Sequence, residues 1–331
     1  MNRYLILETL ASLINSQESL IESFNVLNLV FTKLPIEKIK HSLNHGEPIE
    51  KTMTYLIQDN LFLEFFTFYL ETNFVDQAIL KSVEICRKKD ELKNHILKSL
   101  IYPVFLLIGL LLFSFVAVFY LQPQLLEFYH SFEIQRTWLS ILFLNLLFVF
   151  PLVLLIVLGL LSAISIYFFL FLKQQHFEQL ERWLKIPLFH QLLKKYYTLK
   201  FCLYYKELVK MKYDFKTICE LLSNRIQDRC LKMIVFEFKE QILKGDALEI
   251  IIQNFTFFED YFKTIFTLSL HHQNPQNLLD QYYTTTLMLL ETKIKQKVTT
   301  MVIGVYGIVG GYIIGIYMGM VMPMMNMLEN F

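Results

Sequence analysis

The chain has 331 residues, of which 54% are hydrophobic and only 18% are charged. This balance is too apolar for an ordinary soluble domain and indicates a protein in contact with membrane lipid. The 31 basic and 30 acidic residues nearly cancel, which argues against a basic surface for direct binding of nucleic acid.

Residues 1–99 are expected to form a first cytoplasmic helical domain. Apolar residues recur at helical spacing between Leu10 and Leu27. Gly46 ends a helix of this region, at the position where glycine commonly follows the last turn. Glu8 interrupts the first apolar run, which is not the pattern of a secretory signal peptide. We therefore expect this domain to remain inside the cell.

Three uncharged stretches predict transmembrane helices over residues 100–121, 138–172 and 298–328, with lengths of 22, 35 and 31 residues. The second is too long for one upright span, so we expect it to tilt or to continue beyond the membrane. Pro151 lies within it and is a possible kink. A hairpin of two spans is the poorer alternative, because the stretch is too short for two crossings and a turn.

The distribution of Lys and Arg predicts the orientation of these spans. Residues 1–99 carry 11 of them and residues 173–297 carry 19, whereas residues 122–137 carry one and the chain after Val321 carries none. We therefore expect a multi-pass protein of the cell membrane with both helical domains in the cytoplasm. The loop 122–137 and the tail 329–331 are expected outside.

Residues 173–297 are expected to form a second cytoplasmic helical domain that repeats the first. Gly46 and Gly245 each follow a helix that carries lysines, and each precedes a cluster of aromatic residues. Each region then continues through one more helix into a span. The predicted class is an all-α membrane protein with two homologous helical bundles and three transmembrane helices.

No motif for catalysis, a cofactor or a metal is present. Phosphate-binding and dinucleotide-binding glycine motifs are absent, as is the serine motif of hydrolases. His41 and His45 share a helix face without an identifiable third ligand, so we interpret them as an exposed pair. The four cysteines form no metal-binding pair and are expected to be reduced thiols packed in helices. The protein is not expected to be an enzyme.

The third span carries glycines every four residues, at Gly307, Gly311, Gly315 and Gly319. This spacing places them on one face, where the missing side chains allow another helix to approach closely. Two interpretations remain open: a contact with another subunit or partner, and packing against the protein's own spans.

The chain resembles the inner-membrane platform proteins of type II secretion and type IV pilus machines, and most of all the short members of Gram-positive competence pseudopili. The resemblance extends over most of the chain, and its motifs are the Tyr-Pro entry to the first span, the start of the second domain, one glycine in each repeat and the closing Pro-Met segment. The positions that match are Tyr102, Pro103, Pro187, Gly46, Gly245 and Pro323.

The chain departs from the family at several positions. The Gly-Glu-x-x-Gly-x-Leu element is eroded in both copies, and the proline that usually begins the last span is missing. Gln17 and Lys212 replace the glycine of the turn after the first helix of each repeat.

The resemblance implies a platform that couples a cytoplasmic ATPase to the extraction of pilin-like subunits and to filament growth for DNA uptake, without cofactors or covalent chemistry. Membrane lipid and further copies of the chain are the other implied partners. An alternative is a membrane subunit of an ATPase-driven transport or secretion complex unrelated to pili. The basic residues that we consider possible ATPase contacts are Lys38, Lys40, Arg87, Lys88, Lys89, Arg225, Arg229, Lys232 and Lys239.

Overall fold

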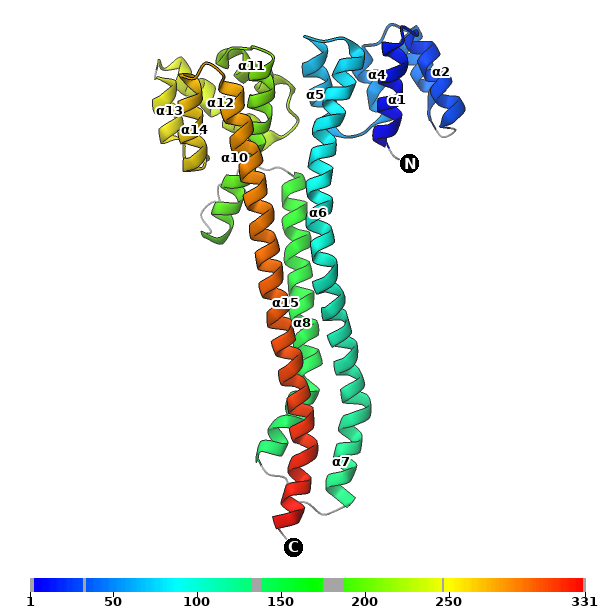
Figure 1. Cartoon of the computed structure of the whole chain (residues 1–331), viewed down its shortest axis with the longest axis vertical. Helices are drawn as coiled ribbons and strands as arrows, with labels where there is room; N and C mark the ends of the chain where they lie inside the picture. Colours follow the sequence, from blue (N-terminus) through cyan, green and yellow to red (C-terminus); the bar gives the residue numbers. More distant parts are fainter. Residues whose placement is uncertain (1–2, 32–33, 132–137, 175–186, 246, 330–331) are drawn as a thin grey trace. The chain divides into compact units, whose positions relative to one another are not determined.

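The structure is a computed structural model, and it describes residues 3–31, 34–131, 138–174, 187–245 and 247–329. Every regular element in these ranges is a helix, and none of them contains a strand (Figure 1). The predicted all-α class is therefore confirmed.

The N-terminal helices are short and follow each other closely, up to a long helix that continues into the first apolar stretch. Ser19 and Asp59 cap two of them by accepting hydrogen bonds from Glu22 N (3.2 Å) and Leu61 N (2.9 Å), which satisfies amides that have no partner within the helix. The elements are α1 (Arg3–Asn15), α2 (Leu20–Val30), α3 (Ile36–Asn44), α4 (Ile49–Leu56), α5 (Asn60–Leu70) and α6 (Val75–Val116).

The middle region is likewise a series of helices that ends in a long helix continuing into an apolar stretch. Prolines begin the first and the last of them, where the missing N–H costs no hydrogen bond, and Asp228 caps α12 by accepting from Leu231 N at 3.0 Å. The elements are α10 (Pro187–Lys210), α11 (Phe215–Arg225), α12 (Arg229–Leu243), α13 (Leu248–Asn254), α14 (Asp260–Leu270) and α15 (Pro275–Glu329).

Four turns in these two regions have a left-handed backbone. Gly46 and Gly245 have φ values of 68° and 87°, and Gln17 and Lys212 are the two described non-glycine residues with positive φ, at 66° and 64°. At Gln17 and Lys212 the chain makes the same pair of helix-ending hydrogen bonds. A non-glycine residue in this conformation costs about 1 kcal/mol, so both positions keep a turn geometry that glycine would adopt more easily.

The chain divides into two compact units. Unit 1 comprises Met1–Lys93 with Gln175–Met288, and unit 2 comprises Asn94–Gln174 with Leu289–Phe331. The N-terminal and middle helices thus belong to the same unit. Its core is rich in aromatic side chains, and the largest fully buried ones are Tyr204, Tyr282, Phe24, Phe62, Phe65, Phe66, Phe68, Phe201, Phe238, Phe258, Phe262 and Phe266.

Unit 2 contains the apolar stretches. Besides parts of α6 and α15 it includes the π-helical turn η1 (Ala117–Leu121), α7 (Gln122–Ser131) and α8 (Trp138–Gln174). Among the described residues, three helices are long and apolar enough to cross a membrane, which agrees with the predicted number of spans by length and composition. Their buried contact is an apolar cluster of Ala117, Leu125, Tyr129, Leu144, Leu147, Tyr312 and Ile316.

Two features of unit 2 refine the expectations from the sequence. The second apolar stretch is one helix of 37 residues, about 55 Å long at 1.5 Å per residue, so it is not a hairpin. The segment after the first span, expected as a loop, is helical as α7 up to Ser131; the rest of that loop lies outside the described residues.

Candidate functional site

The N-terminal and middle helices of unit 1 are joined by polar contacts of α5 and of the residue that follows it, among them the buried Glu64. Glu64 accepts hydrogen bonds from the Tyr204 hydroxyl and from the amide N–H of Gln227, the latter at 2.7 Å. The Tyr204 ring stacks on Phe65 with 4.9 Å between ring centroids. We call the contacts of Glu64, Tyr69 and Glu71 with the middle helices the polar seam.

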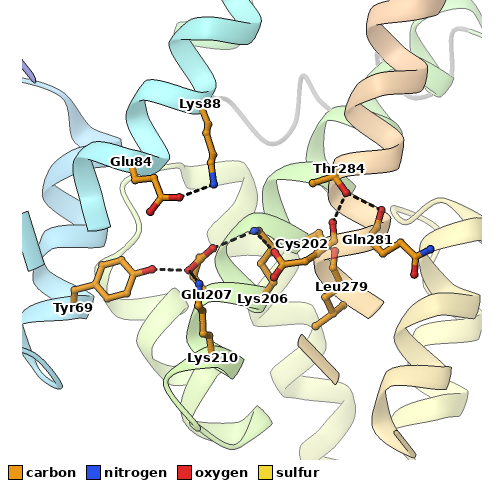
Figure 2. Close-up of polar contacts among 11 residues, drawn as sticks. Tyr69, Glu84, Lys88, Cys202, Lys206, Glu207, Lys210, Leu279, Gln281 and Thr284 are labelled. Atoms are coloured by element: carbon orange, nitrogen blue, oxygen red, sulfur yellow. Dashed lines mark hydrogen bonds and ion pairs between the residues drawn. The ribbon is translucent and has the colours of Figure 1, made fainter. Parts of the chain in front are cut away.

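The centre of the polar seam extends from α5 through α10 to α15. The Tyr69 hydroxyl donates to Glu207 at 2.5 Å, and Lys206 Nζ lies 3.1 Å from the same carboxylate. Lys206 also donates to Asp280 of α15 at 2.5 Å. Figure 2 shows Tyr69 and Lys206 meeting at Glu207 from different helices. Helices α5 and α10 are therefore linked through one buried ion pair to α15, which continues into an apolar stretch.

The outer end of the polar seam is more exposed. Glu71, directly after α5, accepts a hydrogen bond from the Tyr213 hydroxyl at 2.9 Å and pairs with Arg225. We predicted Arg225 as a possible ATPase contact, and the structure places its side chain in this seam within the chain.

Burial and charge set the protonation of these groups. Burial raises the pKa of Glu64, and the hydrogen bonds from Tyr204 and Gln227 offset only part of that rise. Burial lowers the pKa of Lys206, but the neighbouring carboxylates of Glu207 and Asp280 outweigh it, so the pKa is raised overall. Lys206 therefore stays charged at physiological pH, and it pairs with the buried Glu207 carboxylate, which would be costly to leave without a cation.

The turn between α11 and α12 is held from two sides. The amide of Gln227 is bound by Glu64. The next residue, Asp228, is buried, caps α12 and pairs with Lys200 of α10. These contacts fix the start of α12 relative to both α5 and α10. The whole arrangement holds α5, α10 and α12 together through buried polar contacts.

The remaining basic residues that we predicted as ATPase contacts lie on three separate helices. Arg87 pairs with Glu8 at 2.5 Å and Lys88 pairs with Glu84 at 2.7 Å, both on the surface. The others lie on α3 (Lys38, Lys40), α6 (Lys89) and α12 (Arg229, Lys232, Lys239).

The four glycines on one face of α15 differ in their surroundings. Gly315 and Gly319 are buried, and a Cβ added at Gly319 would lie 3.9 Å from Leu125 Cδ1. At Gly307 and Gly311 no atom lies within 4 Å of the position that a Cβ would take. The later glycines therefore pack within unit 2, whereas Gly307 and Gly311 face open space.

This difference predicts that two matched substitutions will affect stability differently. We expect Gly319→Leu to lower the stability of the full chain by about 1–3 kcal/mol, because the larger side chain would overpack the contact with Leu125. Gly307→Leu should leave thermal unfolding in lipid nanodiscs unchanged. Equal destabilisation by both substitutions would contradict this difference.

The other positions of the family resemblance lie as follows. Tyr102 and Tyr306 are half exposed in unit 2, and their hydroxyls contact each other. Pro103 is buried within α6. Pro187 begins α10 and Pro323 lies within α15.

The histidine pair and the cysteines are part of the helical framework. The rings of His41 and His45 stack with 4.0 Å between centroids, and His45 Nδ1 lies 2.8 Å from the His41 carbonyl oxygen. All four cysteines are buried and free. Burial raises the pKa of the Cys219 thiol to about 12, so this thiol is an unreactive core residue.

The pairs of the polar seam are not evident from the sequence alone. A signal exists in the apolar sequence of α5, where Glu64 is the one charged residue between Asn60 and Leu70. Glu207 similarly follows two tyrosines of an aromatic helix. An ionisable residue inside such a run is rarely buried without a partner, so its presence predicts a pairing but not the identity of the partner.

The comparisons with known proteins add no relative. No protein-family model matches the chain, and no curated protein matches it at a significant level.

Proposed function

We propose that the chain is the membrane platform of a type IV pilus-like competence pseudopilus. The observation that carries this proposal is the order of its segments. Two regions of short helices each lead into one long helix, α6 or α15, that continues without a break into an apolar stretch long enough to span a membrane. This order is the one that the family resemblance implies.

The two helical regions are proposed to be homologous cytoplasmic bundles, over residues 1–99 and 173–297. Their turns support this repeat: Gln17 and Lys212 adopt the same left-handed conformation after the first helix, and Gly46 and Gly245 do so after the third. The cytoplasmic location rests on the excess of Lys and Arg in these regions. The same excess predicts an N-terminus inside the cell and a C-terminus outside.

In this function the platform performs no covalent chemistry. A cytoplasmic ATPase docks on the bundles, and its cycle moves the long helices, which helps to lift pilin-like subunits from the membrane into the filament. The polar seam supports such coupling because it ties α5, α10 and α15 together through Glu207 and Lys206. The open glycines, Gly307 and Gly311, are proposed to contact another copy of the chain or a pilin-like subunit within the membrane.

The test is an in-frame deletion, scored for surface filament and for uptake of added DNA, with a complemented strain beside it. We expect the loss of both and their recovery on complementation. Normal filament and normal uptake would refute the competence assignment and favour a transport or secretion complex without a pilus.

A further inference from the structure

Helix α12 has a second apolar face that the fold leaves uncovered. Its inner face is fully buried through Leu231, Ile234, Val235 and Phe238. On the outer face, Met233, Phe236 and Leu243 are 41%, 51% and 68% exposed. These three apolar side chains lie along one side of the helix. We call Arg229, Met233, Phe236, Glu240 and Leu243 the α12 stripe.

The α12 stripe has the spacing of a coiled-coil seam. Its members follow one another by alternating steps of four and three residues, which keeps them on one line of an α-helix and is the pattern by which one helix packs against another. Three of the five members are apolar, and the other two, Arg229 and Glu240, are charged. The buried residues of α12 are occupied by the core of unit 1, so they do not contribute to this line. A partner that fits the stripe is therefore itself helical.

The corresponding helix of the first region lacks such a face. When the two regions are aligned on Gly46 and Gly245, Phe236 corresponds to Glu37 and Leu243 corresponds to Asn44. Both residues of α3 are polar and exposed. The same place in the repeat is thus an ordinary solvated surface in one copy and an apolar surface in the other, which associates the α12 stripe with a role specific to the second copy.

The charges beside the stripe select the partner. Lys232 and Lys239 lie seven residues apart along one edge, at the flanking positions where charged residues choose the partner of a helix pair. A second copy of α12 fits poorly. The opposite edge carries Glu237 and Lys244. An antiparallel pair would bring the two lysine edges together. A parallel pair would match Lys232 with Glu237, but it would oppose Lys239 to Lys244 and place Arg229 and Glu240 each against its own copy. An acidic flank would complement the lysine edge.

We propose that the α12 stripe binds an amphipathic helix of a partner protein, with apolar residues at heptad spacing and acidic residues on the flank that faces Lys232 and Lys239. The chemistry of recognition follows from α12 itself; only the identification of that helix with a part of the ATPase rests on the proposed function. Because the turn before α12 is bound by Glu64, an occupant of the stripe would lie next to the polar seam.

The test measures binding of designed peptides to the full chain in lipid nanodiscs by fluorescence anisotropy. The first probe has leucine at the heptad core positions, glutamate on the flank that faces Lys232 and Lys239, and glutamine on the other flank. The second has lysine in place of the glutamate, and the third is the chain's own segment 229–244. We expect the glutamate peptide to bind at least about tenfold more tightly than the other two, a difference of about 1.4 kcal/mol. Empty nanodiscs are the control for binding to lipid.

Variants then locate the site. Phe236→Glu with Leu243→Asn, which copies the residues of the first region, should weaken binding of the glutamate peptide at least about tenfold. Lys232→Glu with Lys239→Glu should reverse the preference toward the lysine peptide. The matched control, Lys212→Glu with Lys216→Glu, reverses two charges of the same region away from the stripe and should change nothing.

Several results would overturn the inference. These are equal binding of both designed peptides, binding that survives the Phe236 and Leu243 changes, tighter binding of the chain's own segment, and binding that empty nanodiscs reproduce. The labelling rate of the buried cysteines, all of which lie in unit 1, shows whether a variant remains folded. A normal filament in the deletion strain would refute the pilus function without altering these peptide results, so the two failures are distinguishable.

Discussion

Tyr204→Ala is expected to destabilise unit 1 by about 3–5 kcal/mol, the cost of removing a fully buried large aromatic side chain. Two interactions are lost together. The ring is packed between α5 and α10, with Phe65 stacked on it and Phe68 edge-on at 6.4 Å. The hydroxyl is a hydrogen-bond partner of the buried Glu64 carboxylate.

Smaller substitutions separate these contributions. Tyr204→Phe keeps the ring and should cost about 1–3 kcal/mol, because it leaves the buried Glu64 with one partner fewer. Glu64→Gln should cost less than Tyr204→Phe, since a neutral amide still accepts from the Gln227 amide. In the double variant the two costs should not add, because both changes remove the same contact.

We also expect the stability of unit 1 to depend on pH through Glu64. Burial raises its pKa above the ordinary value of 4.5, so the folded chain retains this proton over a range in which the unfolded chain has lost it. The contribution of Glu64 to stability therefore declines as the pH rises from 4.5 through the raised value. Glu64→Gln should abolish this decline. An unchanged pH profile in the variant would contradict the assignment.

These effects are measured in the full chain through its buried cysteines. All four lie in unit 1, so the rate at which a thiol reagent labels them in denaturant reports the unfolding of this unit and not of the apolar helices. If Tyr204→Ala labels no faster than the original chain, the polar seam does not hold unit 1 together.

Lys206→Met is expected to cost about 3 kcal/mol, near the lower end of the range for breaking a buried ion pair. Lys206 and Glu207 have side chains that are only 11% and 8% exposed, so the substitution leaves a buried carboxylate without its main cation. The cost is near the lower end because Lys210, 3.9 Å from Glu207, offers partial compensation. The same labelling of buried cysteines measures this cost.

Two further variants make this prediction specific. Lys210→Met removes a lysine from the same helix, but its side chain is 57% exposed, so it should cost less than about 1 kcal/mol. Adding Glu207→Gln to Lys206→Met should recover part of the loss, because no unpaired charge is then buried. Equal effects of the two lysine variants would show that the link from α5 to α15 does not pass through Lys206.

The sequence alone determined the helical class and the number of apolar spans. Both follow from local patterns: the absence of charge over 22, 35 and 31 residues meets the length requirement of a bilayer. The turns at Gly46 and Gly245 could also be predicted from the sequence, because glycine commonly ends a helix in a left-handed conformation. Gln17 and Lys212 adopt the same conformation without being glycine, so the presence of a glycine could not indicate these two turns.

The tertiary structure decided which of these residues meet. Glu64 and Tyr204 are 140 residues apart, and no local pattern specifies a pair at that distance along the chain. Repetition of glycine every four residues indicated one contact face on α15, yet only packing showed that Gly319 is covered by Leu125 while Gly307 is open. The α12 stripe can likewise be recognised only in the structure, which shows that the other face of this helix is buried in the core. Period and composition act within one helix, whereas burial depends on what the rest of the chain places against it.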